Sequence, residues 1–295
     1  MAGVGFIGLG QMGAAMAGHL VEHTGGLTVF DVKPETATDL VAAGGRLATS
    51  VAETAACSNV IEIMVLDDQQ VMDVCCGPDG VLAHAPDHAV VAIHSTIHPR
   101  TAMELGRLAH ELRPTVSFVD APVSGGFVGA LDASLAVMVG GESDAVEMCR
   151  PVFERWAGLV IHLGPLGAGT RAKLARNLLH FTSFTAANEA QRLAEAYGID
   201  LRKLAKVIRH TDRITGGASS IMLRDTTTPL APGDEWYETL IHVRTLGEKD
   251  LSLALELAED VGLDLPLGTV ALEAFAGSLG LASGRDIVSP STDRP

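Results

Sequence analysis

A glycine-rich segment near the N-terminus has the residue types and spacing that hold a pyrophosphate. It follows the apolar run Val4–Gly8 and leads into a stretch with helical spacing. Glycines let the backbone turn tightly and approach phosphates, and the first turn of the helix offers free N–H groups and the positive end of its dipole. With a plain glycine-rich turn as the alternative, we predict a dinucleotide-binding loop formed by Gly8, Leu9, Gly10, Gln11, Met12 and Gly13.

An acidic residue at the end of the second predicted strand indicates which dinucleotide the loop binds. Asp31 lies 23 residues after Gly8, where a carboxylate can bind both ribose hydroxyls and repels a 2′-phosphate. No arginine stands at Val32, whereas the ammonium of Lys33 would attract a phosphate. We therefore predict NAD and leave NADP open. An FAD enzyme or a methyltransferase shares such a loop but does not account for the motifs below.

A lysine and an asparagine in the middle of the chain have the spacing of a reactive pair on one helix face. Lys173 and Asn177 are four residues apart, and the glycine-rich turn Gly167–Gly169 precedes them. In a dry site beside an oxidised nicotinamide, such a lysine would accept the hydroxyl proton of an alcohol as hydride leaves carbon. Asn177 would position the substrate. A solvated helix surface is the alternative, because lysine is usually exposed.

A serine and two glycines follow another predicted strand. Ser124, Gly125 and Gly126 would expose backbone N–H groups and one hydroxyl, which together suit a substrate carboxylate. Serine and glycine also mark ordinary turns, so the pattern alone leaves both interpretations open.

Composition excludes several classes of protein. The 295 residues are 47% apolar and carry a net charge of −15, which argues against a disordered chain and against a nucleic-acid-binding one. No apolar run approaches the roughly 18 residues of a membrane span, and the first residues do not resemble a signal peptide. The four cysteines form no CxxC pair and the 11 histidines no HExxH motif. We expect a cytoplasmic protein without a metal site.

Apolar runs that alternate with helical stretches predict an α/β domain over residues 1–164, with a Rossmann-type doubly wound sheet. The predicted strands are Val4–Gly8, Leu27–Asp31, Val60–Val65, Ala89–His94, Val116–Ala121, Leu135–Gly140 and Leu159–Leu163. The predicted helices are Gln11–His23, Pro34–Ala43, Asp68–Cys75, Pro99–Arg113 and Ser143–Ala157.

The remaining residues, 165–295, predict an all-helical domain. Its expected helices are Thr170–Tyr197, Leu201–His210, Thr245–Val261 and Leu267–Leu279. The polar segment Arg224–Tyr237 fits a lid, a subunit contact or a surface loop. The polar tail Ser283–Pro295 is expected to fray.

Motifs over nearly the whole chain resemble those of the β-hydroxyacid dehydrogenase family, in the family's order. They are GFIGLGQMG at the N-terminus, Asp120–Gly126 with Gly129-Ala130 and Leu135–Gly141, Gly167–Gly169 with Lys173 and Asn177, and Glu248–Leu251 with Leu253–Leu255. The resemblance implies a Rossmann domain, a helical C-terminal domain for substrate binding and dimerisation over residues 165–295, and a homodimer or homotetramer.

The resemblance also implies roles for single residues. The family's catalytic lysine falls at Lys173 and its substrate-contacting asparagine at Asn177. Further cofactor contacts fall at Val65, Leu66, Gln70, Thr96 and Lys249. The chain departs from the family where Leu66 replaces a usual proline and where Leu178 replaces a second asparagine.

These features predict an oxidoreductase that transfers a hydride between NAD and a short β-hydroxy acid or its semialdehyde, of the 3-hydroxyisobutyrate type known from valine catabolism. One alternative is a reductase of tartronate or succinic semialdehyde. Another is an NADP-dependent imine reductase, although those enzymes usually lack the lysine found at Lys173. A catalytically silent nucleotide-binding or reader module is a third, against which the aromatic content of 4% argues.

Overall fold

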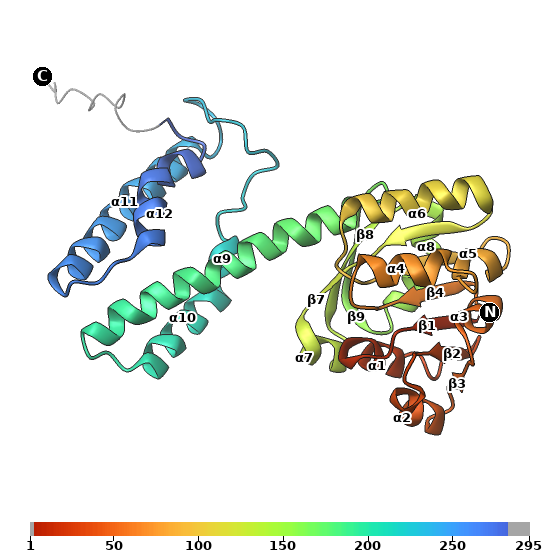
Figure 1. The fold of residues 1–295 in the computed structure, drawn as a ribbon. Coiled ribbons are helices and arrows are strands. Elements are labelled where there is room, and N and C mark those ends of the chain that lie inside the picture. The colour runs from red at the N-terminus through yellow and green to blue at the C-terminus, as the bar shows by residue number, and fades with distance from the viewer. Residues whose placement is uncertain (1–2, 283–295) are drawn as a thin grey trace, which may run out of the picture. The chain divides into compact units, whose positions relative to one another are not determined.

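The computed structural model describes residues 3–282, which form two compact units (Figure 1). The first unit extends to Asn177 and the second begins at Leu178. The expectation for the tail Ser283–Pro295 therefore lies outside the described residues. Each unit is taken by itself below.

The first unit contains a nine-stranded sheet whose first six strands are parallel, in the order β3-β2-β1-β4-β5-β6. This is the order of a doubly wound dinucleotide-binding sheet. Beyond β6, β8 is antiparallel to both β6 and β7, and β9 is parallel to β8. The strands are β1 Val4–Ile7, β2 Leu27–Phe30, β3 Arg46–Leu47, β4 Val60–Ile63, β5 Val90–Ile93, β6 Ser117–Asp120, β7 Val123–Ser124, β8 Leu135–Gly140 and β9 Ala157–Gly164.

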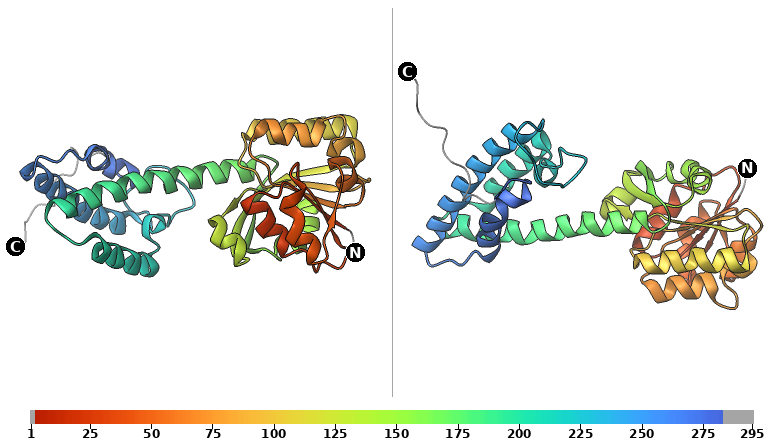
Figure 2. Two further views of the ribbon diagram at one scale, coloured as in Figure 1. Left: turned by 60° about the horizontal axis from the view of Figure 1, so that its bottom comes forward. Right: turned by 90° about the horizontal axis from the view of Figure 1, so that it is seen from above.

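Helices cover both faces of this sheet, as predicted. Figure 2 shows α4 to α6, in orange and yellow, along one side of the strands. The helices of this unit are α1 Gln11–Gly18, η1 Pro34–Ala37, α2 Thr38–Ala42, α3 Val51–Ala56, α4 Asp68–Cys76, α5 Val81–His84, α6 Pro99–Leu112, α7 Gly126–Leu131 and α8 Ser143–Phe153.

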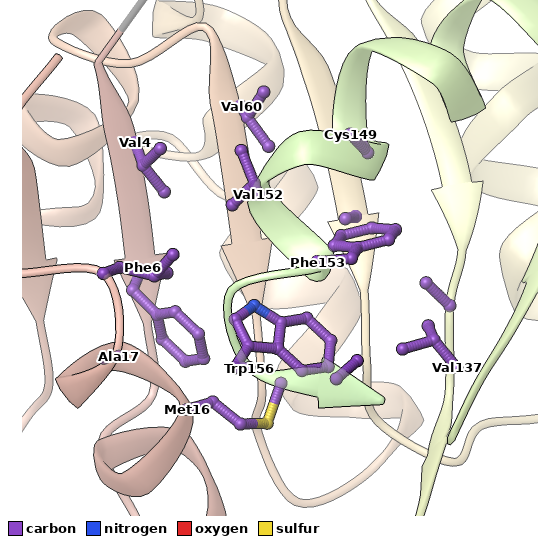
Figure 3. Packing of buried hydrophobic residues seen from close by; sticks show 14 of the residues in the cluster. Val4, Phe6, Met16, Ala17, Val60, Val137, Cys149, Val152, Phe153 and Trp156 are labelled. Atoms are coloured by element: carbon purple, nitrogen blue, oxygen red, sulfur yellow. The ribbon is translucent and has the colours of Figure 1, made fainter. Parts of the chain in front are cut away.

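Two apolar cores lie on opposite faces of the sheet because successive strand side chains point to opposite sides. Phe6 packs with Met16, Phe153 and Trp156 on the face covered by α1 and α8 (Figure 3). Its neighbour Ile7 belongs to the core on the other face, with side chains from α3 to α6. Burial on both faces explains the nearly continuous apolar runs of the central strands.

The differences from the predicted elements are local. The pattern misses the two-residue strands β3 and β7 and the short helices α3, α5 and α7. A helix cap was the available signal for α3, since the Ser50 hydroxyl accepts the N–H of Glu53. Helix α8 ends at Phe153 rather than Ala157, and Trp156 beyond its end is fully buried in the core.

The second unit is helical, as predicted. Its helices are the larger part of α9 Ala168–Ala196, α10 Leu201–Thr215, η2 Gly217–Ser219, α11 Tyr237–Asp260 and α12 Pro266–Ser278. Helix α11 begins eight residues before the predicted Thr245, and the segment between η2 and α11 is irregular. None of the helices in residues 3–282 is both long and apolar enough to cross a membrane.

Helix α9 begins in the first unit, where its first turn packs tightly on the sheet. A Cβ on Gly169 would lie 2.2 Å from the Met138 carbonyl oxygen and 2.5 Å from that of Asp120. The helix can therefore approach β6 and β8 this closely only with glycine at this position. The compact units divide inside α9, after Asn177, whereas the sequence places the domain boundary at 164/165.

We expect Gly169→Ala to destabilise the first unit by about 1–3 kcal/mol, since the added methyl meets backbone atoms that cannot move aside. The matched control is Gly18→Ala, because no atom lies within 4 Å of a Cβ at this other helical glycine. The control should be neutral or stabilising by up to about 1 kcal/mol. Urea unfolding of both variants measures the difference, and equal stabilities would contradict the packing argument.

Candidate active site

Close backbone contacts require two of the three glycines in the loop between β1 and α1. Gly8 has φ +95°, and a Cβ on it would lie 2.3 Å from the Met64 carbonyl oxygen. A Cβ on Gly13 would lie 2.0 Å from the Gly8 carbonyl oxygen, so this glycine lets α1 pack on the loop. Gly10 caps α1 without a side chain and has open space around it. The free N–H groups of the helix therefore face solvent-accessible space.

Asp31 holds this loop from the end of β2. Its Oδ2 accepts the backbone N–H of Leu9 at 2.7 Å, and its Oδ1 accepts that of Lys33 at 2.9 Å. A carboxylate has about four acceptor positions, so capacity remains for ribose hydroxyls. The next side chain, Val32, is 84% exposed and brings no positive charge. The arrangement fits the prediction that Asp31 binds the hydroxyls of an adenosine ribose.

A cavity of about 570 Å³ lies along the loop and is formed entirely by the first unit. Among the predicted cofactor residues, those that line it are Gly8, Gly10, Gln11, Met12, Gly13, Asp31, Val65, Leu66 and Gln70. Leu9 instead turns its side chain into the core. The lining residues that the sequence analysis missed are Ile7, Phe30, Val32, Met64, Asp73 and Val74. The helical spacing of Gln70, Asp73 and Val74 on α4 was a usable signal for part of this set.

Hydrogen bonds fix the loop after β4, which forms one wall of this cavity. The Val65 N–H donates to Ser95 Oγ at 2.9 Å, and the Ser95 hydroxyl donates back to the Val65 carbonyl oxygen at 2.7 Å. The Leu66 N–H donates to Gln70 Oε1. Thr96 follows Ser95 at the end of β5 and is exposed, so its predicted contact with the cofactor stays a prediction.

Lys173 lies against the β7 segment that carries the other predicted substrate residues. Its Nζ donates to the Val123 carbonyl oxygen at 2.6 Å and lies 3.1 Å from Ser124 Oγ. The side chain is buried, with 8% of its surface exposed. Burial lowers the pKa of Lys173 below its ordinary value, and the charge of Arg176 adds to the effect. This lysine is therefore no surface residue.

Asp120, at the end of β6, positions the helix that carries Lys173. Its two carboxylate oxygens accept the N–H groups of Gly167 at 2.6 Å and Thr170 at 2.5 Å. A negative charge at a helix N-terminus is favourable. Burial raises the pKa of Asp120, and the N–H groups of Thr170 and Gly167 oppose that rise. The sequence analysis quoted Asp120 only as part of a motif and missed this role.

The remaining predicted site residues are less tightly held. Gly125 and Gly126 have φ +135° and +66°, which favour glycine, and both are exposed at the start of α7. Asn177 is half-buried, and its Oδ1 accepts from Arg176 at 3.3 Å. Lys249 is exposed on α11 of the second unit and pairs with Asp250 at 2.6 Å. The role of each residue toward a ligand stays a prediction.

Two family models together match nearly the whole chain. Residues 3–164 match the NAD-binding domain of 6-phosphogluconate dehydrogenase. Residues 167–286 match the NAD-binding domain of NADP-dependent 3-hydroxyisobutyrate dehydrogenase. The sheet domain is thus an NAD(P)-binding domain, in agreement with the glycine loop, Asp31 and the cavity.

Related proteins agree with these matches over at least nine tenths of their lengths. The chain is 51% identical to an uncharacterized oxidoreductase of Mycobacterium tuberculosis, with 94% of this chain and 93% of the relative covered. It is 34% identical to an NAD-dependent L-serine dehydrogenase of Pseudomonas aeruginosa, with 92% and 90% covered. A crystal structure of an oxidoreductase from Mycobacterium avium 104 is 49% identical with a TM-score of 0.89, covering 95% of this chain and 99% of that one.

We expect Asp31→Ala to reduce the discrimination against NADP, because it removes the negative charge that would repel a 2′-phosphate. The expected change is about tenfold in the ratio of the two dissociation constants, measured by titrating NADH and NADPH against the protein fluorescence. Asp39→Ala, an exposed carboxylate on α2, is the control for net charge. An unchanged ratio in Asp31→Ala would show that Asp31 does not read the ribose.

Proposed function

Because the chain belongs to the β-hydroxyacid dehydrogenase family, we propose that it oxidises a short β-hydroxy acid to the semialdehyde with NAD, using Lys173 as the general base. The observation that carries this proposal is the buried amine of Lys173, held against Val123 and Ser124. It lies in the same unit as the dinucleotide loop and its cavity.

The residues around the glycine loop would hold the cofactor. The N–H groups at the start of α1 suit the pyrophosphate, and Asp31 suits the adenosine ribose. When bound, the nicotinamide ring supplies a hydride acceptor. The chain itself must supply the proton acceptor and the groups that orient the substrate.

Lys173 has the properties of that proton acceptor. Its lowered pKa raises the fraction of neutral amine at a given pH. A neutral amine has two N–H donors, which the Val123 carbonyl and the Ser124 hydroxyl can accept, and its lone pair remains for the hydroxyl proton of the substrate. In the reverse reaction the ammonium returns this proton to the aldehyde oxygen.

Substrate recognition falls to the residues next to Lys173. The backbone and hydroxyl of Ser124, Gly125 and Gly126 would bind the carboxylate, and Asn177 would hold a substrate oxygen in line with the amine. Two substrates have direct support among relatives. The second family model is named for 3-hydroxyisobutyrate dehydrogenase and one relative is an L-serine dehydrogenase. These acids share a carboxylate and a β-hydroxyl and differ in the group on the α-carbon.

Our proposal includes a homo-oligomer, because the second unit leaves much apolar surface uncovered. In residues 178–282 the buried apolar residues are Ala194, Leu240, Ala258, Leu265, Ala276, Leu279 and Leu281. Exposed large apolar side chains occur on each of its long helices, among them Leu178, Phe181 and Phe184 on α9, Val207 and Ile214 on α10, Leu253 on α11 and Val270 on α12. Surfaces of this kind mark subunit interfaces, and a second copy offers matching apolar surface.

We expect wild-type protein to reduce NAD with one or more of a panel of β-hydroxy acids (3-hydroxyisobutyrate, L-serine, 3-hydroxypropionate and glycerate), in preference to the γ-hydroxy acid 4-hydroxybutyrate. Lys173→Ala should bind NADH with unchanged affinity while kcat falls by at least about a hundredfold, since it removes the proton acceptor. Lys206→Ala, an exposed lysine on α10, is the matched control. Comparable kcat in Lys173→Ala and wild type would remove Lys173 from the mechanism, and silence across the panel would reject the substrate class.

The oligomer has its own test by light scattering after gel filtration. A chain of 30.7 kDa should elute with at least twice that mass at micromolar concentration. Ile214→Glu places a charge on the exposed apolar surface of α10 and should lower the mass or the dimer affinity. Leu112→Glu makes the same change at an exposed position of the first unit and should not. A monomeric wild type would contradict the oligomer.

A further inference from the structure

Two ionisable side chains lie fully buried in the core of the sheet domain, and the proposed mechanism does not use them. Glu62 of β4 and His94, just after β5, have no exposed side-chain surface. The register pairs Glu62 with Phe6 on one side and Ala92 on the other. Glu62 therefore points to the face covered by α8, and His94 lies two residues beyond Ala92 on the same face.

Aromatic rings surround this pair. The His94 ring centroid lies 5.1 Å from that of Trp156 and 5.3 Å from that of Phe153, both edge to face, and 6.4 Å from Phe6. These three rings lie close together in Figure 3. The Trp156 indole N–H donates to Glu62 Oε1 at 3.3 Å. Packing of this kind fixes the plane of the His94 ring.

The hydrogen bond between His94 and Ala121 shows which ring nitrogen carries a hydrogen. Nδ1 lies 2.8 Å from the Ala121 carbonyl oxygen, and because a carbonyl oxygen only accepts, Nδ1 must carry a hydrogen. Nε2 then faces Glu62 Oε1 at 3.7 Å, an ion-pair distance. Among the described residues neither Nε2 nor Glu62 Oε2 has a hydrogen-bond partner. At 3.7 Å the ring and the carboxyl interact electrostatically rather than through a hydrogen bond, so Nδ1 is the nitrogen through which the ring is hydrogen-bonded.

Stability alone does not account for such a pair, since a buried ion pair can often be replaced by apolar residues at no cost. Its location suggests another role. Ala121 follows Asp120, which holds the first turn of α9, and Val123 two residues later accepts the amine of Lys173. His94 thus holds the middle of the segment that positions Lys173 from both sides.

We propose that Glu62 and His94 are positioning residues that fix the Ala121 carbonyl, and with it the segment 120–124 against which Lys173 lies. Glu62 faces Nε2 of the ring and accepts the Trp156 indole N–H, which holds the ring and the indole together, and the ring holds Ala121 through Nδ1. The titratable groups whose charges interact with Glu62 include His23, after α1, and Cys149 of α8. The catalytic consequence rests on the proposed function, but the positioning itself does not.

The test measures the protonation of Lys173 without substrate or cofactor, by competitive labelling with acetic anhydride across pH and mass spectrometry. Glu62→Leu with His94→Phe replaces the pair by apolar side chains and removes the Nδ1 donor. Burial lowers the pKa of Lys173, so loosening of segment 120–124 should raise its labelling midpoint by about one pH unit. His94→Asn places an amide N–H where Nδ1 was and should keep the midpoint despite lower thermal stability.

A third variant separates the effect on the position of Lys173 from a general loss of stability. Val152→Ala, a buried change on α8 over the same core, should lower Tm and leave the Lys173 midpoint unchanged. A wild-type midpoint in the double variant, or midpoints that follow Tm in all variants, would overturn the proposal. On unmodified protein, ¹⁵N NMR of the His94 ring must show a protonated Nδ1, and a bare Nδ1 would overturn it too.

The catalytic consequence is measured separately. With whichever acid the wild type oxidises, the double variant should lose about tenfold in kcat with little change in the KM for NAD. Failure of the whole panel would reject the proposed function and leave the labelling result standing. A raised midpoint with unchanged kcat would separate the positioning from catalysis and reject its catalytic consequence.

Discussion

The carboxylate of Asp120 is the interaction on which the candidate site depends. It ends β6 and accepts the N–H groups of Gly167 and Thr170, which fixes where α9 starts and how it is rotated. That rotation brings Lys173, one turn later, against Val123 and Ser124. These hydrogen bonds also explain why glycine is needed at position 169, because they hold the start of α9 almost in contact with β6 and β8. Lysine side chains are usually exposed, so the buried position of Lys173 depends on this contact.

The cofactor side of the domain uses the same device. Asp31 ends β2 and accepts the N–H of Leu9 from the glycine loop, as Asp120 ends β6 and accepts N–H groups from α9. In both cases a carboxylate at the carboxyl end of a parallel strand holds backbone that arrives from elsewhere in the sequence. Charge-assisted hydrogen bonds of this kind are stronger than neutral ones and therefore suited to fixing a loop in one place. Carboxylates at the ends of two separate strands, β2 and β6, thus hold the glycine loop and the start of α9 in place.

The sequence predicts the parallel strands, the covering helices and the glycine loop because each is a local pattern of several residues. It also pairs Lys173 with Asn177 correctly on one helix. It does not reveal that Asp120 meets Gly167, since that contact joins residues 47 positions apart. Nor does it show that Glu62 is buried, because a glutamate in an apolar strand carries no mark of its distant partners His94 and Trp156. Long-range polar contacts are what local periodicity cannot encode.

The environment of Lys173 balances two opposing effects. The Val123 carbonyl is a good acceptor for an ammonium and would raise the pKa of the lysine, whereas burial and the charge of Arg176 lower it. Burial prevails in the protein alone, and an oxidised nicotinamide nearby would add a positive charge that acts in the same direction. A carboxylate beside Lys173 would favour the ammonium form, which cannot accept a proton, so the absence of such a partner among the described residues suits a general base. A hydrogen-bond acceptor without charge orients the amine and leaves its lone pair available to take a proton.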